Sequence, residues 1–155
     1  MHKVSVILHD IRSSENVGSI FRTADAAGVS KLYLTGYTPA PLDRFKRENA
    51  KLTKASLGAE NYVSWERTED IFSLIERLKQ KGIVVIAVEQ SPSAVQYIEL
   101  DIKGPAAFIF GNEVDGLPHE ILNVADQIIE IPMRGKKESL NVSVAAGIIL
   151  YHALR

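Results

Sequence analysis

The chain has 155 residues, of which 46% are hydrophobic and 24% charged, a composition typical of a folded globular protein rather than a disordered or collagenous one. The absence of cysteine excludes disulfides and thiolate metal sites, and no apolar run approaches the ~20 residues that span a bilayer. The net charge of −1 hides an asymmetry, because residues 12–54 contain eight basic and four acidic side chains. We therefore expect a single cytoplasmic domain over residues 1–155, with no membrane partner and one basic region.

Five strands are predicted from apolar runs, and helical patterns separate most of them. The runs cover residues 4–8, 31–35, 83–88, 106–110 and 127–131. Several are apolar at consecutive positions, as is typical of parallel strands that are covered on both faces. This alternation predicts an α/β fold, a three-layer sandwich with a mostly parallel sheet. Ligands of such sheets bind beyond the carboxyl ends of the strands, so the connections that follow strands are the first candidates for a site.

The first candidate segment is a predicted helix over residues 16–28. It begins with Asn16, a capping residue, and ends at Gly28, which suits the position after a helix. Its apolar stripe consists of Ile20, Phe21, Ala24 and Ala27. Arg22 is the unusual member, although a lone arginine on a helix is most often a solvated surface residue.

A basic stretch follows the second predicted strand. Arg44, Arg47, Lys51 and Lys54 recur at intervals of three or four, so they would share one face if this stretch is helical. Such a stripe is either a solvated surface or a contact surface for a phosphate backbone. The local excess of positive charge supports the second interpretation.

The second candidate segment, residues 111–118, follows a buried strand. Glycines flank the carboxylate of Glu113, and Pro118 is suited to open a helix. Backbone without a Cβ, as at Gly111, can approach a ligand closely. The same residues would also suit an ordinary strand-to-helix turn.

The third candidate segment runs from Ile131 to Asn141 and precedes a predicted helix over residues 142–154. Ser139 or Asn141 could be the N-cap of that helix. A helix N-terminus at this place would also direct its amides toward a ligand. The two interpretations can hold together.

Several other classes of site have no support. There is no G-x-G-x-x-G, no Walker A loop and no G-x-S-x-G elbow, which weakens dinucleotide, nucleoside-triphosphate and esterase hypotheses. The four histidines are scattered without the spacing of ligands, so we expect no metal.

Taken in order, the three segments resemble the motifs of the SpoU (TrmH-type) RNA 2′-O-ribose methyltransferases of the SPOUT superfamily. The matching patterns are Asn16-x-Gly18-x-x-x-Arg22-x-Ala24, Phe110-Gly111-x-Glu113-x-x-Gly116-Leu117, and Ile131-Pro132-Met133 with Ser139-Leu140-Asn141-x-Ser143-x-Ala145. The resemblance covers nearly the whole chain and leaves out the additional N-terminal RNA-binding domain that many members carry.

The resemblance implies an enzyme that uses S-adenosyl-L-methionine, forms a homodimer and has a deep trefoil knot near its C-terminus. It also implies a cofactor site formed by Glu89, Gly111, Ile131, Met133 and Leu140, in which Gly111 would let the chain approach the ribose. The implied catalytic residues are Arg22, Asn16, Glu113, Ser139 and Asn141. An arginine is a poor general base because its guanidinium holds its proton tightly, so we expect Arg22 to stabilise the developing alkoxide or to hold a phosphate.

The expected partner is RNA, either tRNA or rRNA, and no DNA binding is expected. The expected RNA contacts are Arg12, Arg22, Arg44, Arg47 and Lys51. One alternative is a catalytically silent RNA-binding or ribosome-assembly factor with the same fold. Another is a nucleotide- or cofactor-binding α/β enzyme that is unrelated to RNA.

Overall fold

The structure is a computed structural model that describes residues 2–155. Its centre is a seven-stranded sheet of order β3-β2-β1-β6-β4-β7-β5, in which every neighbouring pair is parallel. The strands are β1 (Val4–His9), β2 (Lys31–Thr35), β3 (Ser64–Arg67), β4 (Val84–Val88), β5 (Val95–Gln96), β6 (Ala106–Phe110) and β7 (Gln127–Glu130). The prediction of a mostly parallel α/β sheet is confirmed.

Helices cover both faces of this sheet. They are α1 (Ser14–Ala27), α2 (Ala50–Ser56), α3 (Ile71–Gln80), α4 (His119–Val124) and α5 (Val142–Ala153), with short 3₁₀ helices η1 (Ala59–Asn61) and η2 (Tyr97–Glu99). Successive strand residues point to opposite faces. In β1, Val6 and Leu8 therefore pack with α1 and α5, whereas Ile7 packs with α3 and α4. These two buried clusters form the core of a three-layer sandwich.

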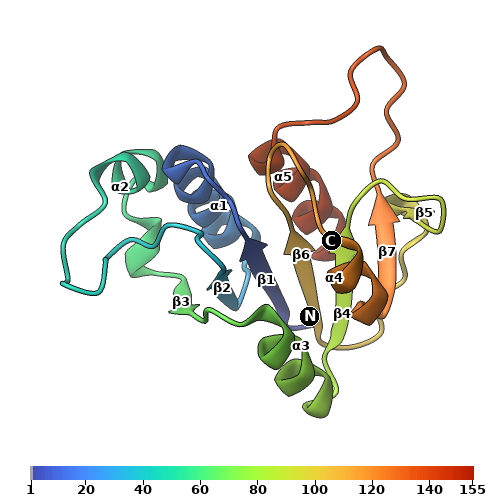
Figure 1. The fold of residues 1–155 in the computed structure, drawn as a ribbon, viewed down its shortest axis with the longest axis horizontal. Helices are drawn as coiled ribbons and strands as arrows, with labels where there is room; N and C mark the ends of the chain where they lie inside the picture. The colour runs from blue at the N-terminus through green and yellow to red at the C-terminus, as the bar shows by residue number, and fades with distance from the viewer. Residues whose placement is uncertain (1) are drawn as a thin grey trace.

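The carboxyl ends of the strands meet at one edge of the sheet, as Figure 1 shows for β1, β6 and β7. The long connection from β7 to α5 rises beyond this edge and returns over it (Figure 1). The three candidate segments therefore begin on the same side of the molecule.

The two edge strands, β3 and β5, are absent from the prediction. Each pairs with one neighbour only, and β3 carries Ser64, Glu66 and Arg67 around a single aromatic residue. Strands at a sheet edge are less buried than central ones and show no continuous apolar run. An apolar-run criterion therefore misses them.

The first helix begins earlier than predicted. Its N-cap is Ser13, whose hydroxyl accepts a hydrogen bond from the backbone N–H of Asn16. Asn16 thus lies inside the first turn, and the prediction that it is the cap is wrong. Gly28 ends the helix in the left-handed conformation at φ 85°, as predicted.

The basic stretch is helical only in its second half. Helix α2 begins at Ala50 after the N-cap Asn49, so Arg44 and Arg47 lie in the preceding loop and share no helix face with Lys51. The carboxylate of Asp43 accepts hydrogen bonds from the backbone N–H groups of Phe45 and Arg47. Such local side-chain bonds compete with a helix, which explains why the periodicity was misleading here.

Within residues 2–155, no helix is both long and apolar enough to cross a membrane.

Candidate active site

A pocket of about 480 Å³ lies at the carboxyl edge of the sheet. Three connections line it: residues 89–92 after β4, residues 111–117 after β6, and part of residues 131–140 after β7. The start of α5 closes the remaining side with Val142 and Ala145. The second and third candidate segments therefore share one cavity, whose volume lies within the range of roughly 300–1,000 Å³ common for small-molecule sites.

All five residues expected to bind a cofactor line this pocket: Glu89, Gly111, Ile131, Met133 and Leu140. Three of them offer apolar surface. Carboxylates also line the cavity, namely Glu89, Glu113, Asp115 and Glu130. The lining therefore suits a ligand that has an apolar ring system and carries positive charge.

The Glu89 side chain links the loop after β4 to the loop after β6. Its Oε2 accepts a hydrogen bond from the N–H of Leu117 at 2.8 Å, and its Oε1 accepts one from Gln90 at 2.9 Å. Gly116 lies against this carboxylate, since a Cβ there would sit 2.1 Å from Oε2. The connection after β6 is thus held against the end of β4.

The fold itself requires glycine at position 111, in addition to the predicted close approach of the backbone to a ligand. A Cβ at this position would lie 2.7 Å from the carbonyl carbon of Gly116 and 2.7 Å from Cγ of Leu117. The loop folds back on itself here through a bridge between Asn112 and Gly116. A side chain at position 111 would prevent that turn.

A polar cluster built on Glu113 lies beside the pocket. The Glu113 carboxylate accepts hydrogen bonds from the backbone N–H of Arg12 at 3.1 Å and of Ser13 at 3.2 Å. The Asn16 side chain donates to Glu113 Oε1 at 3.4 Å and accepts from Asn141 Nδ2 at 3.2 Å. Three residues that are distant in the sequence, Asn16, Glu113 and Asn141, are therefore in contact.

The pKa of Glu113 lies below its ordinary value. Burial alone would raise the pKa, but the hydrogen bonds from Arg12, Ser13 and Asn16, with one from its own backbone N–H, outweigh that effect. Each of these donors stabilises the charged form. Glu113 is therefore a carboxylate at neutral pH.

Asn141 combines a structural role with its place in the cluster. Its Oδ1 accepts from the backbone N–H of Ser143 at 2.8 Å, which makes it the N-cap of α5. Ser139 is not the cap, but it lines the pocket. Helix α5 thus begins at the point where the third candidate segment contacts the first, through the hydrogen bond between Asn141 and Asn16.

Arg22 lies apart from this cluster. It is exposed on α1 and does not line the pocket. Among the described residues, its guanidinium forms no hydrogen bond or ion pair. Within one chain, the structure brings Asn16, Glu113, Ser139 and Asn141 to the pocket or its rim and leaves Arg22 outside.

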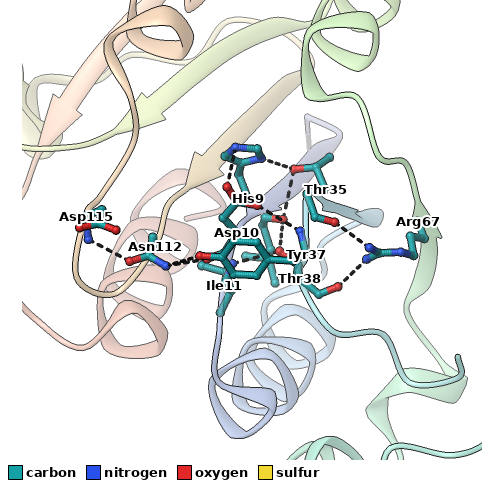
Figure 2. A network of polar contacts seen from close by, with 11 residues as sticks. His9, Asp10, Ile11, Thr35, Tyr37, Thr38, Arg67, Asn112 and Asp115 are labelled. Carbon is teal, nitrogen blue, oxygen red and sulfur yellow. Dashed lines mark hydrogen bonds and ion pairs between the residues drawn. The ribbon is translucent and has the colours of Figure 1, made fainter.

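A second polar network supports the same loops and includes residues that the sequence analysis missed. Asn112 Nδ2 donates to the carbonyl oxygen of Asp10 at 2.9 Å and to the hydroxyl of Tyr37 at 2.8 Å. Its Oδ1 accepts from the N–H groups of Val114 and Asp115. Figure 2 shows the Tyr37 ring reaching across to Asn112. The only sequence signal is an asparagine in a turn next to Glu113.

Asp10 belongs to the same network and contacts Tyr37 and His9 (Figure 2). It adopts φ 53°, and its Oδ1 accepts from the backbone N–H of Tyr37 at 3.1 Å. His9 contacts Asp10 through Nε2 at 3.3 Å and Thr35 through Nδ1 at 2.9 Å, and burial lowers the His9 pKa. A Cβ at Gly36, which adopts φ 61°, would lie 1.8 Å from Asp10 Oδ1, so any other residue would displace the Asp10 carboxylate. The connection between β1 and α1, which carries Arg12 and Ser13, is anchored at this point.

Fold and site together define an α/β protein with a small-molecule pocket at the carboxyl edge of a parallel sheet and a fixed carboxylate at its rim. Residues 3–151 match the model of the SpoU rRNA Methylase family. The chain belongs to this family.

Similar proteins include enzymes with different RNA substrates. The chain is 35% identical over 151 residues to the tRNA (guanosine(18)-2′-O)-methyltransferase of Aquifex aeolicus, a match that covers 97% of this chain and 68% of that protein. A crystal structure of an AdoMet-bound rRNA methyltransferase from Sinorhizobium meliloti superimposes with a TM-score of 0.86 at 30% identity, covering 98% of this chain and 57% of that one.

A third similar structure is close to this chain in length. It was described in a study of 2-OH methylation of C/U34 on tRNA, and it matches with a TM-score of 0.83 at 28% identity. The match covers 98% of this chain and 94% of that one. By contrast, the chain spans about two thirds of the Aquifex enzyme and little more than half of the Sinorhizobium one.

Proposed function

We propose that this protein transfers a methyl group from S-adenosyl-L-methionine to a ribose 2′-hydroxyl of tRNA or rRNA. The observation that carries the proposal is the contact between Asn16, Glu113 and Asn141 at the rim of the pocket, in a chain of the SpoU family. These residues come from the three sequence motifs.

The pocket residues fit the chemistry of this cofactor. S-adenosyl-L-methionine supplies a methyl group on a positively charged sulfonium sulfur. Ile131, Met133 and Leu140 would pack against the adenine, and the backbone at Gly111 would lie near the ribose. The acidic lining, which includes Glu113 and Glu130, would balance the positive charge.

The polar cluster would orient the substrate ribose. Methyl transfer requires that the attacking oxygen be aligned with the methyl carbon, so the main task of the protein is positioning. Glu113 is fixed by four hydrogen bonds from Arg12, Ser13 and Asn16, which leaves the Asn16 amide in a defined orientation. Ser139 and Asn141 would hold the loop that covers the cofactor.

Arg22 would act on the oxygen that becomes negative or on the adjacent phosphate. A guanidinium is a poor proton acceptor, so the proton of the hydroxyl leaves through another group or through water. The exposed position of Arg22 agrees with a role toward RNA rather than toward the cofactor. Arg12, Arg44, Arg47 and Lys51 are also exposed and would contact the phosphate backbone.

We further propose a homodimer in which α5 is covered by a second copy. This helix is apolar on nearly all sides, and Val144 and Tyr151 remain 50% and 57% exposed. A helix that is hydrophobic all round is normally buried. Helix α1, which carries Arg22, packs beside α5 and would lie close to the interface. Because Arg22 does not line its own pocket, its proposed role requires that it face the pocket of the second copy.

The test is methyl transfer in vitro. The protein is incubated with S-adenosyl-L-methionine labelled in its methyl group and, in parallel, with bulk tRNA and with rRNA. We expect label in one of the two RNAs, released after nuclease digestion as a 2′-O-methylated nucleoside. RNA binding without incorporation in either pool would contradict the proposal and favour a silent RNA-binding factor.

A further inference from the structure

An aromatic side chain stands out on the loop between β2 and α2. Phe45 is 63% exposed and lies in a turn that is closed by an antiparallel bridge between Leu42 and Glu48. Phenylalanine is usually buried because its whole side chain is apolar. The position of Phe45 at an exposed turn therefore needs an explanation.

The turn holds its shape without help from the core. Asp43 Oδ1 accepts from the N–H groups of Phe45 at 2.8 Å and Arg47 at 2.9 Å, and Asp43 Oδ2 accepts from Arg47 Nε at 2.7 Å. Lys46 adopts φ 60°, which reverses the chain. These contacts present Phe45 at the tip in a defined position.

Two guanidinium groups lie over the ring. The guanidinium carbons of Arg44 and Arg47 lie 4.8 and 5.0 Å from the centre of the Phe45 ring, and Lys46 is the next residue along the turn. Such an aromatic group within a cluster of positive charge matches the chemistry of an unpaired nucleotide, which has a flat base and a negative phosphate. A partner protein with an apolar patch would not match these charges.

We propose that the turn Leu42–Glu48 is a subsite for single-stranded RNA, in which an unpaired base stacks on Phe45. The incoming base displaces one of the two guanidinium groups from the Phe45 ring, and that arginine can then stack on the other face of the base. The remaining cationic side chains of the turn contact the neighbouring phosphates. The ring takes no part in binding a duplex, whose bases stack on one another. This inference rests on the proposed function and adds a specific contact to it.

The test compares Phe45→Leu with wild type in binding a fluorescein-labelled U12 oligonucleotide over a series of KCl concentrations. Leucine keeps apolar volume but lacks the flat π face. We expect affinity to fall roughly 5- to 100-fold with an unchanged salt slope, because base stacking is lost while phosphate contacts remain. Phe45→Trp should retain the affinity. Phe72→Leu on α3, where Phe72 is 46% exposed, is the matched control and should bind as wild type.

Two further measurements separate stacking from other roles. Arg44→Gln with Arg47→Gln should lower the salt slope by roughly 0.7 for each lost phosphate contact on a single strand. Phe45→Leu should leave binding of a 12-base-pair RNA duplex unchanged. Equal affinity of Phe45→Leu and wild type for U12, or an equal loss for U12 and duplex, would overturn the proposal. A change in sedimentation of Phe45→Leu with normal U12 binding would instead make the turn a protein contact.

Failure of the Phe45 subsite and failure of the proposed methyl transfer give different results in the two assays. If wild type methylates RNA while Phe45→Leu binds U12 normally, the subsite is wrong and the proposed function stands. If wild type transfers no methyl group but Phe45→Leu loses U12, the subsite stands and the enzymatic function is wrong.

Discussion

Asn16 has a partner for each end of its amide. Its nitrogen donates to Glu113, and its oxygen accepts from Asn141, so the amide cannot rotate without losing one of the two bonds. This arrangement links the ends of three elements through one side chain. Arg22, six residues further along α1, has no such partner among the described residues and is free to meet a ligand.

At this scale we predict that Arg22→Ala lowers methyl transfer by roughly 100- to 1,000-fold, the usual cost of removing a group that stabilises developing negative charge. The affinity for S-adenosyl-L-methionine should stay within about twofold of wild type, because Arg22 does not line the pocket of its own chain. Single-turnover kinetics and calorimetric titration measure the two quantities. A comparable loss in both would contradict the assigned role.

Helices α1 and α2 approach each other closely at Gly18. A Cβ at this position would lie 2.3 Å from the carbonyl oxygen of Leu52 and 2.8 Å from Cβ of Ala55. Glycine inside a helix costs about 1 kcal/mol relative to alanine. The close contact with α2, which carries Lys51, explains why glycine is nevertheless used in the Asn16-x-Gly18 pattern.

Gly18→Ala is therefore predicted to lower the free energy of unfolding by about 1–3 kcal/mol, despite the better helix propensity of alanine. Gly147→Ala is the matched control within α5, where the nearest atom to the added Cβ is Thr23 Cγ2 at 3.9 Å. That variant should be neutral or slightly more stable. Urea denaturation at one protein concentration compares the two, and equal stability of both variants would show that the α1–α2 contact can relax.

For the whole molecule, strand order determines which loops meet. Strands β1 and β6 are neighbours, with Val4 beside Ala106 and Leu8 beside Phe110. The connections that follow them are about a hundred residues apart in sequence, yet the N–H groups of Arg12 and Ser13 bind Glu113. The pocket arises because β4 and β7 continue the same edge.

The proposed homodimer is tested at this scale by Tyr151→Glu. A carboxylate on the exposed face of α5 would be desolvated in the interface, so we expect wild type to sediment as a dimer and the variant as a monomer. Phe72→Glu on α3 is the control and should remain a dimer. Circular dichroism verifies that the variants are folded, and a monomeric wild type would refute the proposal.

Much of the fold could be predicted because the central strands are apolar throughout. Residues 31–35 and 106–110 agree with β2 and β6 at both ends. The edge strands β3 and β5 were not predicted, because neither contains a continuous apolar run. The hydrogen bonds of Asp43 form a turn where the periodicity indicated a helix. The trefoil knot stays a prediction from the family, since local patterns carry no information about threading.

The sequence by itself determined the apolar strands, the glycine after α1, a capping residue at Ser139 or Asn141 before the last helix, and the residue types of the three motifs. These features depend on neighbours within a few positions. Only the tertiary structure decided that Asn16, Glu113 and Asn141 touch, that Asn112 bonds Tyr37, and that Arg22 stands apart from its own pocket. The physical reason is that such contacts depend on strand order and helix packing, which bring together side chains that local periodicity treats separately.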